Sequence, residues 1–394
     1  MKKLWCPLAF NGIVVKTDGR YRSCCASSND AVDKGQQITR QTHNVDQAFN
    51  SEFFKRIRFN LEQGIKDENC SRCWEEEDFG IQSYRLKQID KFKNNLDENE
   101  KLQIVDLALS NQCNLKCRIC QPNDSTTWIK EFYDIDIKDK EIPFREYQKS
   151  KTFYEHTDSS FINNLKENIE NIKHMSFYGG EPFLIKSTWD LLTYASERNF
   201  SKNIELVFNT NGTVWDDKKE NLLSNFKQVE LHLSIDGIGN RFEYLRHPAQ
   251  WKNVYDNIIR IIKWRDTNPS TRRVIIDCSV STLNVWYVPE LVTFCKNYNL
   301  DIYVNIVLEP SHYAISNIPQ QAKEEIIKYY DLALTEDQEI KKIYGYLSVS
   351  QDADSWRNFI VDVTKRDQYR NEKFQDTFAE YYQILSSNNL FDLS

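Results

Sequence analysis

The chain has 394 residues, of which 40% are hydrophobic and 28% are charged, and its formal net charge is −7. This composition excludes a disordered protein, and no apolar run approaches the roughly 18 residues that a bilayer-spanning helix needs. The acidic balance argues against a protein that coats nucleic acid. We therefore expect neither a membrane nor a nucleic acid among its partners.

The apolar start of the chain is not typical of a secretion signal. The run from Leu4 to Phe10 contains Pro7 and stops at Asn11, with no small-residue cleavage pattern after it. We therefore expect a cytoplasmic location, where cysteines stay reduced. Ten cysteines are present, eight of them in the first 120 residues, and their close spacings then indicate metal ligation rather than disulfides.

Three segments follow one another along the chain. Residues 1–100 hold five cysteines and a predicted helical stretch over 46–66, where large apolar residues recur with helical spacing. Residues 101–318 alternate strand-like and helix-like runs, which is typical of a parallel α/β domain. Residues 319–394 are predicted to form a helical extension, and the charged stretch 121–160 has no clear pattern.

The middle segment contains six predicted β/α units, too few for a full eight-unit barrel. We therefore expect an α/β fold of the open partial (β/α)6 barrel type, flanked by a small N-terminal cluster-binding domain and the C-terminal extension. The predicted strands cover 102–110, 173–178, 204–209, 229–236, 274–282 and 301–309. The predicted helices cover 161–170, 186–199, 217–225, 251–265 and 286–298.

Three cysteines, Cys113, Cys117 and Cys120, follow the first predicted strand of this segment. Structural zinc takes four ligands in a closed tetrahedron, and ferredoxin-type clusters also take four cysteines. No fourth cysteine follows nearby, and three ligands on a four-iron cluster leave one iron open for another molecule. The loop therefore indicates a reactive centre rather than a structural one.

Further motifs occur at the ends of the next three predicted strands. They are Gly179-Gly180-Glu181-Pro182, Asn209-Thr210-Asn211-Gly212 and Leu233-Ser234-Ile235-Asp236-Gly237, the last followed by Arg246. Together with the cysteine loop, this ordered series resembles the radical S-adenosylmethionine (SAM) superfamily over residues 102–310. The resemblance implies a 4Fe-4S cluster on Cys113, Cys117 and Cys120, with SAM bound at the open iron.

The same resemblance implies roles for the other motif residues. The Gly-Gly turn would bind the amino group of the methionine part of SAM, because a Cβ would obstruct so close an approach. Ser234 would lie near the ribose, and Arg246 would pair with the carboxylate, which suits the geometry of a guanidinium group. Further polar contacts would come from Asn209, Asn211 and Asp236.

A second set of cysteines, in the first segment, resembles half of the auxiliary-cluster module called SPASM, whose shortened form is called twitch. The matching residues are Cys6, Cys24-Cys25, Cys70 and Cys73, with Gly19 at the SPASM-like spacing before Cys24. The resemblance implies an auxiliary 4Fe-4S cluster on Cys6, Cys24, Cys70 and Cys73, although Cys25 is an alternative to Cys24. Zinc is the alternative metal, because an all-cysteine site that ends in Cys-x2-Cys also suits it.

The resemblance implies a radical SAM oxidoreductase. It would cleave SAM reductively and use the 5′-deoxyadenosyl radical to abstract hydrogen from a substrate, as a net oxidation assisted by the auxiliary cluster. The partners would be an electron donor such as flavodoxin or ferredoxin and a small-molecule or peptide substrate. The alternatives are a maturase acting on a peptide that a partner presents and a non-catalytic zinc protein.

Overall fold

A computed structural model describes residues 4–93, 95–96, 100–137, 141–153, 159–333, 338–349 and 352–391. Its internal contacts divide the chain into two compact units. The first comprises Met1–Gln112, Thr152–Asn209 and Asp216–Glu230, and the second comprises Cys113–Lys151, Thr210–Trp215 and Leu231–Ser394. Neither unit is continuous in sequence, so their boundaries differ from those of the three predicted segments, which stay predictions.

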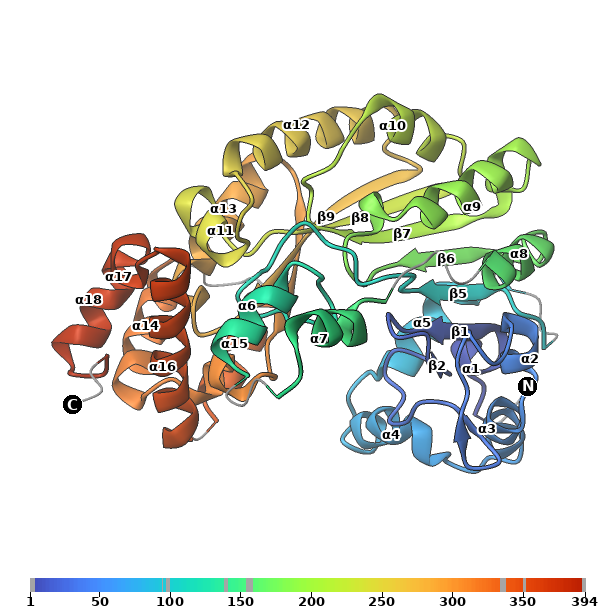
Figure 1. Ribbon diagram of the computed structural model, residues 1–394, viewed down its shortest axis with the longest axis horizontal. Coiled ribbons are helices and arrows are strands. Elements are labelled where there is room, and N and C mark those ends of the chain that lie inside the picture. Colours follow the sequence, from blue (N-terminus) through green and yellow to red (C-terminus); the bar gives the residue numbers. More distant parts are fainter. Residues whose placement is uncertain are drawn as a thin grey trace. The chain divides into compact units, whose positions relative to one another are not determined.

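The first unit is built on a sheet with the strand order β7-β6-β5-β1-β2 (Figure 1). Strands β5 (Ile104–Leu107), β6 (His174–Phe177) and β7 (Glu205–Thr210) are parallel and lie where the sequence predicts them. Strand β1 (Gly12–Val15) extends this sheet as a parallel neighbour of β5, and β2 (Tyr21–Arg22) pairs with β1 in antiparallel direction. The N-terminal segment thus shares a sheet with β5, β6 and β7.

The helices of the first unit come from two stretches of the chain. Those after the strands are α8 (Ser159–Glu167), α9 (Lys186–Glu197) and α10 (Asp217–Leu223), close to their predicted positions. The N-terminal segment forms α1 (Pro7–Asn11), α2 (Val45–Phe49), α3 (Glu52–Glu62), α4 (Ser71–Asp78), α5 (Tyr84–Phe92) and the ribbon of β3 (Val32–Asp33) and β4 (Gln36–Gln37).

The predicted helical stretch over 46–66 consists of two helices, because the chain breaks between α2 and α3. Asn44 caps α2 through a reciprocal pair of hydrogen bonds with Gln47, and a second helix starts after Ser51. The buried Arg58 of α3 donates from Nη2 to the carbonyl oxygen of Phe49 at 3.0 Å. This bond satisfies a carbonyl at the end of α2 and holds the two helices together.

The second unit contains the end of β8 (Gln228–Ser234), which begins in the first unit, and the strands β9 (Arg272–Val280) and β10 (Asp301–Ile306) in the order β10-β9-β8. Strands β9 and β10 are parallel. Burial alternates along β8, with Val229, Leu231 and Leu233 buried. The helices here are α6 (Trp128–Ile135), α7 (Phe144–Lys151), α11 (Gly239–Leu245), α12 (Trp251–Thr267) and α13 (Val288–Asn297).

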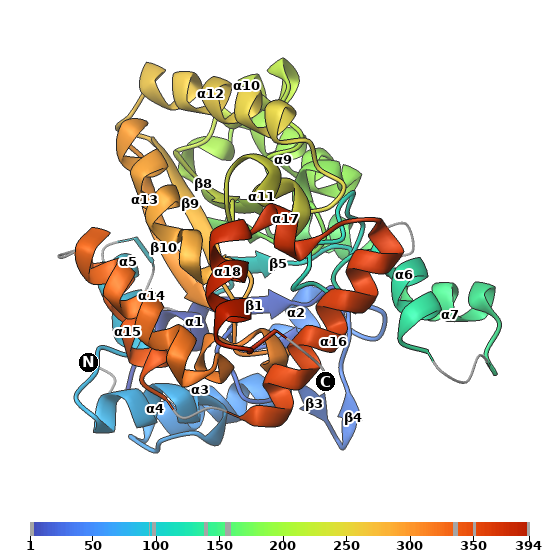
Figure 2. The same ribbon diagram turned by 90° about the vertical axis from the view of Figure 1, so that its left-hand side faces the viewer.

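The C-terminal part of the second unit is helical, as predicted (Figure 2). It comprises α14 (Gln320–Ala333), α15 (Gln338–Leu347), α16 (Ala353–Arg370), α17 (Phe374–Thr377) and α18 (Ala379–Ser387). Its core is aromatic: the ring centroids of Phe374 and Phe378 lie 5.0 Å apart, and Phe359 contacts Phe374 edge-on. This packing fixes the C-terminal end of α16.

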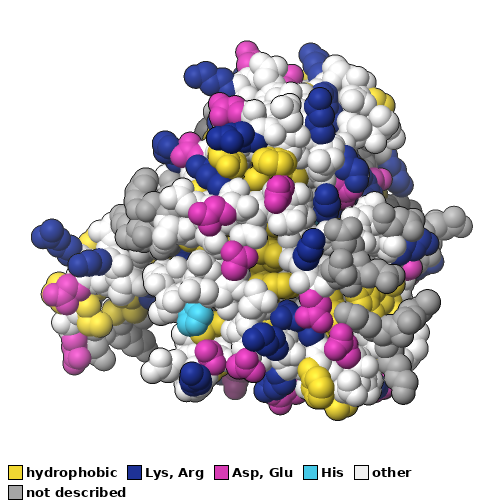
Figure 3. All heavy atoms as spheres, turned by 90° about the vertical axis from the view of Figure 1, so that its right-hand side faces the viewer, with side chains coloured by type: hydrophobic (Ala, Val, Ile, Leu, Met, Phe, Trp, Pro, Cys, Tyr) yellow, Lys and Arg dark blue, Asp and Glu magenta, His cyan; other side chains and the backbone are white. Residues whose placement is uncertain are grey.

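Charged side chains of both signs are interspersed on the face shown in Figure 3, and neither sign forms one continuous patch there. Among the residues that the structure describes, none of the helices has the length and apolar character needed to cross a membrane.

Candidate functional site

The three cysteines of the Cys-x3-Cys-x2-Cys motif lie half-buried on the loop before α6, in the second unit. Two hydrogen bonds shape the loop around Cys117: its carbonyl oxygen accepts from the backbone N–H of Cys120 at 3.0 Å and from Nε1 of Trp128 at 2.8 Å. Burial raises the pKa of the Cys120 thiol, and the charges of Cys117 and Cys113 raise it further. The Cys120 thiol is therefore sensitive to the charges of both other cysteines of the motif.

Nitrogen donors point at two of these sulfur atoms. Sγ of Cys113 receives the backbone N–H of Leu115 at 3.4 Å and Nδ2 of Asn211 at 3.9 Å. Sγ of Cys117 receives Nη1 of Arg246 at 3.7 Å. Hydrogen bonds to cysteine sulfur stabilise thiolate ligands and tune iron–sulfur clusters. The chemistry of these nitrogen donors suits thiolate ligands at Cys113 and Cys117, although the described side chains are not arranged around one metal position.

Arg246 is also held by Asp236, at 2.8 Å between Nη2 and Oδ2. Both side chains are at least nine-tenths buried, and Oδ1 of Asp236 accepts the backbone N–H of Ser279. Nε of Arg246 is buried with no hydrogen-bond partner in the described part of the chain. The guanidinium predicted to bind a carboxylate therefore lies beside Cys117 and retains a donor without a partner.

The predicted Gly179-Gly180-Glu181-Pro182 turn belongs to the first unit and is bonded to the segment that precedes Cys113. Gly180 donates its N–H to the carbonyl oxygen of Ser110 at 3.1 Å, and Glu181 donates to that of Gln112 at 2.8 Å. A Cβ on Gly180 would lie 2.2 Å from the Gln112 oxygen, so the position requires glycine. The buried Glu181 side chain accepts the N–H of Phe183.

The other predicted site residues divide between the units. Asn209 lies on β7 in the first unit. In the second unit, Asn211 is buried and donates to Oδ1 of Asn114 at 3.0 Å, and Ser234 is the last residue of β8. The structure therefore brings Asn211, Asp236 and Arg246 together around the cysteine loop of the second unit.

The four N-terminal cysteines predicted to bind the auxiliary cluster gather in the first unit. Burial raises the pKa of Cys6 to about 11 and that of Cys70 to about 12, and neighbouring thiols contribute to both shifts. The thiol of Cys24 interacts with those of Cys6 and Cys70, and Cys73 interacts with Cys6 and Cys70. Four buried or half-buried thiols provide the donor chemistry that either a cluster or zinc accepts.

Cys25 has different surroundings from Cys24. Its thiol is hydrogen-bonded to Tyr84 and interacts with Asp106. The loop after it is tied to the Cys70 segment by the Ser28 N–H, which donates to the Asn69 carbonyl oxygen at 3.1 Å.

No group of three or more His, Cys, Asp or Glu side chains among the described residues is arranged to hold a metal ion.

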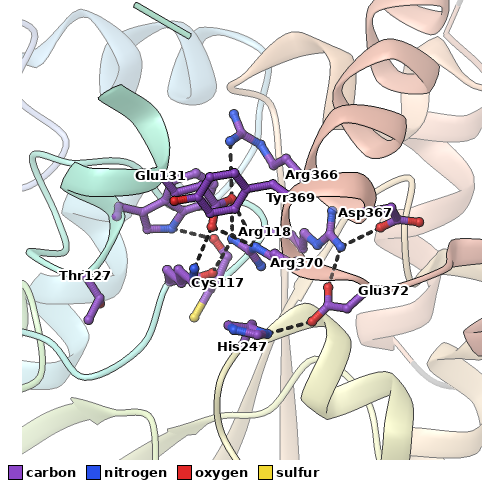
Figure 4. A network of polar contacts seen from close by, with 12 residues as sticks. Cys117, Arg118, Thr127, Glu131, His247, Arg366, Asp367, Tyr369, Arg370 and Glu372 are labelled. Atoms are coloured by element: carbon purple, nitrogen blue, oxygen red, sulfur yellow. Dashed lines mark hydrogen bonds and ion pairs between the residues drawn. The ribbon is translucent and has the colours of Figure 1, made fainter. Parts of the chain in front are cut away.

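Sequence reasoning missed a network of charged residues around the cysteine loop (Figure 4). Arg118, between two of the cysteines, has a fully buried side chain that contacts Asp367 and Glu372. Lys116 pairs with Glu131 of α6, which in turn pairs with Arg370 of α16. The presence of Arg118 inside the cysteine motif could have indicated a buried ion pair. The sequence pattern does not indicate that its partners lie about 250 positions away.

The model of the Radical SAM superfamily matches residues 107–306, half of the chain. The chain is 25% identical over 266 residues to the radical SAM cyclopropyl synthase TigE of Paramaledivibacter caminithermalis, covering 64% of this chain and 51% of TigE. It is 25% identical over 198 residues to the sporulation killing factor maturation protein SkfB of Bacillus subtilis, covering 50% of this chain and 40% of SkfB.

Among solved structures, Streptococcus suis SuiB bound to S-adenosylmethionine aligns with a TM-score of 0.35 and 16% identity, over 78% of this chain and 70% of SuiB. The chain spans about half of the TigE sequence and less of SkfB. The family match covers the cysteine loop and every other predicted SAM-site residue. The chain therefore belongs to the radical SAM superfamily.

Proposed function

We propose that this protein is an enzyme that binds a 4Fe-4S cluster through Cys113, Cys117 and Cys120 and binds SAM beside it. The observation that carries the proposal is the three-cysteine loop with nitrogen donors directed at its sulfur atoms. A cluster held by Cys113, Cys117 and Cys120 would supply the electron for reductive cleavage of SAM to methionine and a 5′-deoxyadenosyl radical, which would abstract hydrogen from the substrate.

The protein's own residues would bind and orient SAM. Arg246 has a buried donor available for the SAM carboxylate, and Asp236 holds its guanidinium in place. The Gly179-Gly180 turn would offer backbone to the amino group, with Asn209, Asn211 and Ser234 as further polar contacts. These roles rest on the motif positions and on the local geometry of each group.

We propose a second 4Fe-4S cluster on Cys6, Cys24, Cys70 and Cys73, in a twitch-like N-terminal domain. The mutual interactions of these four thiols support that set, and the different surroundings of Cys25 favour Cys24 as the ligand. Burial raises the pKa of the Cys6, Cys70 and Cys73 thiols, and the positive charge of Arg85 opposes that rise at each of them. A closed auxiliary cluster suits acceptance of an electron from the substrate radical and hence a net oxidation.

The proposed substrate is a polypeptide that a partner presents. The relation to SkfB, named as the maturation protein of a killing factor, favours this class over a small molecule. The electron would come from a carrier such as flavodoxin or ferredoxin. The six β/α units would form the partial barrel, with residues 1–100 and 319–394 as flanking domains.

The test is an anaerobic assay of the iron-loaded protein with SAM and dithionite, in which 5′-deoxyadenosine is quantified. We expect several turnovers per chain, with methionine formed in equal amount. Because SAM cleavage can depend on substrate, the assay is repeated with a library of synthetic peptides. A fully loaded protein that forms no 5′-deoxyadenosine under any of these conditions would contradict the proposal.

A further inference from the structure

The loop that carries Cys117 is bonded, residue by residue, to the segment that carries Arg246. The N–H of Lys116 donates to the carbonyl oxygen of His247 at 2.7 Å, and the N–H of Arg118 donates to that of Leu245 at 2.8 Å. These two bonds flank the contact between Arg246 and the Cys117 sulfur. The position of Arg246 therefore depends on how the two segments are held against each other.

Glu372 contacts a side chain from each of these segments (Figure 4). Its Oε2 lies 2.5 Å from Nη2 of Arg118, and its Oε1 lies 2.6 Å from Nδ1 of His247. The side chain of Glu372 is 19% exposed, that of Arg118 is 0% exposed and that of His247 is 27% exposed. The carboxylate therefore bridges the other two side chains away from most of the solvent. The Glu372 carboxylate thus links Arg118, which follows Cys117, to His247, which follows Arg246.

The end of α16 determines where Glu372 lies. Asn371 ends the helix in the left-handed conformation, with φ +52°, and the N–H of Glu372 donates to the carbonyl oxygen of Asp367 at 3.0 Å. The side chain of Asp367 accepts the N–H of Phe374 at 2.6 Å and contacts Nη2 of Arg118 at 2.6 Å. The end of α16 therefore contacts Arg118 through Asp367 as well as through Glu372.

From this geometry we propose that Glu372 is a positioning residue, which fixes Arg246 beside Cys117 through His247 and Arg118. The proposal rests on the proposed function, because it assumes that Arg246 binds the SAM carboxylate. Burial raises the pKa of the Glu372 carboxyl, but the hydrogen bond from His247 and the charge of Arg118 outweigh burial and lower it. The group is thus anionic at neutral pH, as the bridge requires.

The test is Glu372→Gln, an isosteric change that removes the charge. We expect the KM for SAM to rise roughly tenfold while kcat changes less than threefold, because SAM is held less well but the chemistry is the same. An independent readout is the SAM concentration that half-converts the electron paramagnetic resonance spectrum of the reduced cluster, which should rise by the same factor. The iron content should stay at the wild-type value.

The matched control is Asp376→Asn, because Asp376 is 65% exposed and pairs with the exposed Lys373. A second pair of variants, at His247, tests the same contact if Glu372→Gln does not fold. His247→Leu removes the contact to Glu372, whereas the amide nitrogen in His247→Asn can replace Nδ1. We expect the asparagine variant to retain wild-type SAM affinity and the leucine variant to lose it.

The outcomes separate the two proposals. A loaded wild-type protein that cleaves no SAM overturns the proposed function and this inference with it. A wild-type protein that cleaves SAM, together with unchanged SAM affinity in both Glu372→Gln and His247→Leu, overturns the positioning role alone. Equal losses in His247→Asn and His247→Leu would also overturn it, because the hydrogen bond would then be irrelevant.

Discussion

Arg118 and Glu372 are 254 positions apart in the sequence, yet Nη2 of the arginine lies 2.5 Å from Oε2 of the glutamate. The same nitrogen lies 2.6 Å from Oδ1 of Asp367, and the guanidinium covers the ring of Tyr244 at 4.0 Å. A fully buried arginine between two cysteines is thereby neutralised by the end of the C-terminal helix α16.

Removal of the buried cation should destabilise the second unit strongly. In Arg118→Met the carboxylates of Asp367 and Glu372 lose their shared partner, and a broken buried ion pair typically costs about 3–5 kcal/mol. Arg118→Lys should lose less, because both contacts come from one terminal nitrogen, which an ammonium group can replace. Chemical unfolding of the three proteins measures this order, and equal stabilities of wild type and Arg118→Met would contradict it.

The Gly180 turn should tolerate no side chain. In Gly180→Ala the new Cβ would lie 2.2 Å from the carbonyl oxygen of Gln112, so the backbone before Cys113 must move. We expect a loss of about 1–3 kcal/mol in the free energy of unfolding and a SAM dissociation constant at least tenfold higher. Calorimetric titration with SAM on the loaded protein measures the affinity.

Gly345, within α15, is the matched control for that substitution. Its Cβ would meet no atom within 4 Å, so Gly345→Ala should stabilise the helix by about 0.5–1 kcal/mol and leave SAM affinity unchanged. If both alanine variants bound SAM as the wild type does, the close backbone contact at Gly180 would have no role in the site.

The adjacent cysteines Cys24 and Cys25 should differ in iron binding. Cys24 interacts with Cys6 and Cys70, whereas Cys25 is hydrogen-bonded to Tyr84. After anaerobic reconstitution we expect about eight irons per chain in the wild type and in Cys25→Ala, but about four in Cys24→Ala. The reverse result would assign Cys25 as the ligand. About four irons per chain in the wild type would contradict the proposal of a second cluster.

Stability should fall in acid because of Glu205. His174, whose Nδ1 lies 3.9 Å from Oε2, and the hydrogen bond from Lys227 at 2.7 Å lower the pKa of the Glu205 carboxyl to about 2, although burial opposes them. A carboxyl whose pKa is lowered in the folded state contributes stability above its unfolded value near 4.5 and loses it as the pH falls toward 2. Burial also lowers the pKa of His174, whose protonation destabilises the fold in the same direction.

Glu205→Gln measures that contribution directly. At pH 7 the variant should be less stable than the wild type by about 2 kcal/mol, and the difference should shrink as the pH approaches 2. The control variant Glu197→Gln, at an exposed position, should have the same pH dependence of the free energy of unfolding as the wild type. Parallel pH curves for wild type and Glu205→Gln would contradict the assignment.

Local patterns predicted the strands β5 to β10 and the helices α8, α9, α10, α12 and α13, because most of them carry a periodic apolar face. The helices α6, α7 and α11 were not predicted. The four-residue strand β1 was not predicted, since Gly12–Val15 is too short and too uniformly apolar to separate a strand from a buried helical turn. Its pairing with β5 depends on a partner about 90 residues away. The break between α2 and α3 was missed because the apolar spacing continues across it.

The cysteine loop and the Gly-Gly turn were predictable because their residues are close in sequence and their chemistry is distinctive. The pairing of Asp236 with Arg246 and the bridge at Glu372 were not, because they join segments by side-chain contacts that leave no periodic pattern. Charged residues on α16 also match an ordinary solvated helix face, and only the fold shows that Asp367 lies against Arg118.

The most direct test of the central claim compares Cys113→Ala with Cys70→Ala in the SAM cleavage assay. Both variants are loaded with iron anaerobically, checked for folding, and assayed for 5′-deoxyadenosine with dithionite and, where the wild type requires it, the substrate peptide. We expect Cys113→Ala to form none, because its three-cysteine set is incomplete, and Cys70→Ala to continue cleaving SAM. Cleavage by Cys113→Ala at the wild-type rate would contradict the assignment of the reactive cluster to this loop.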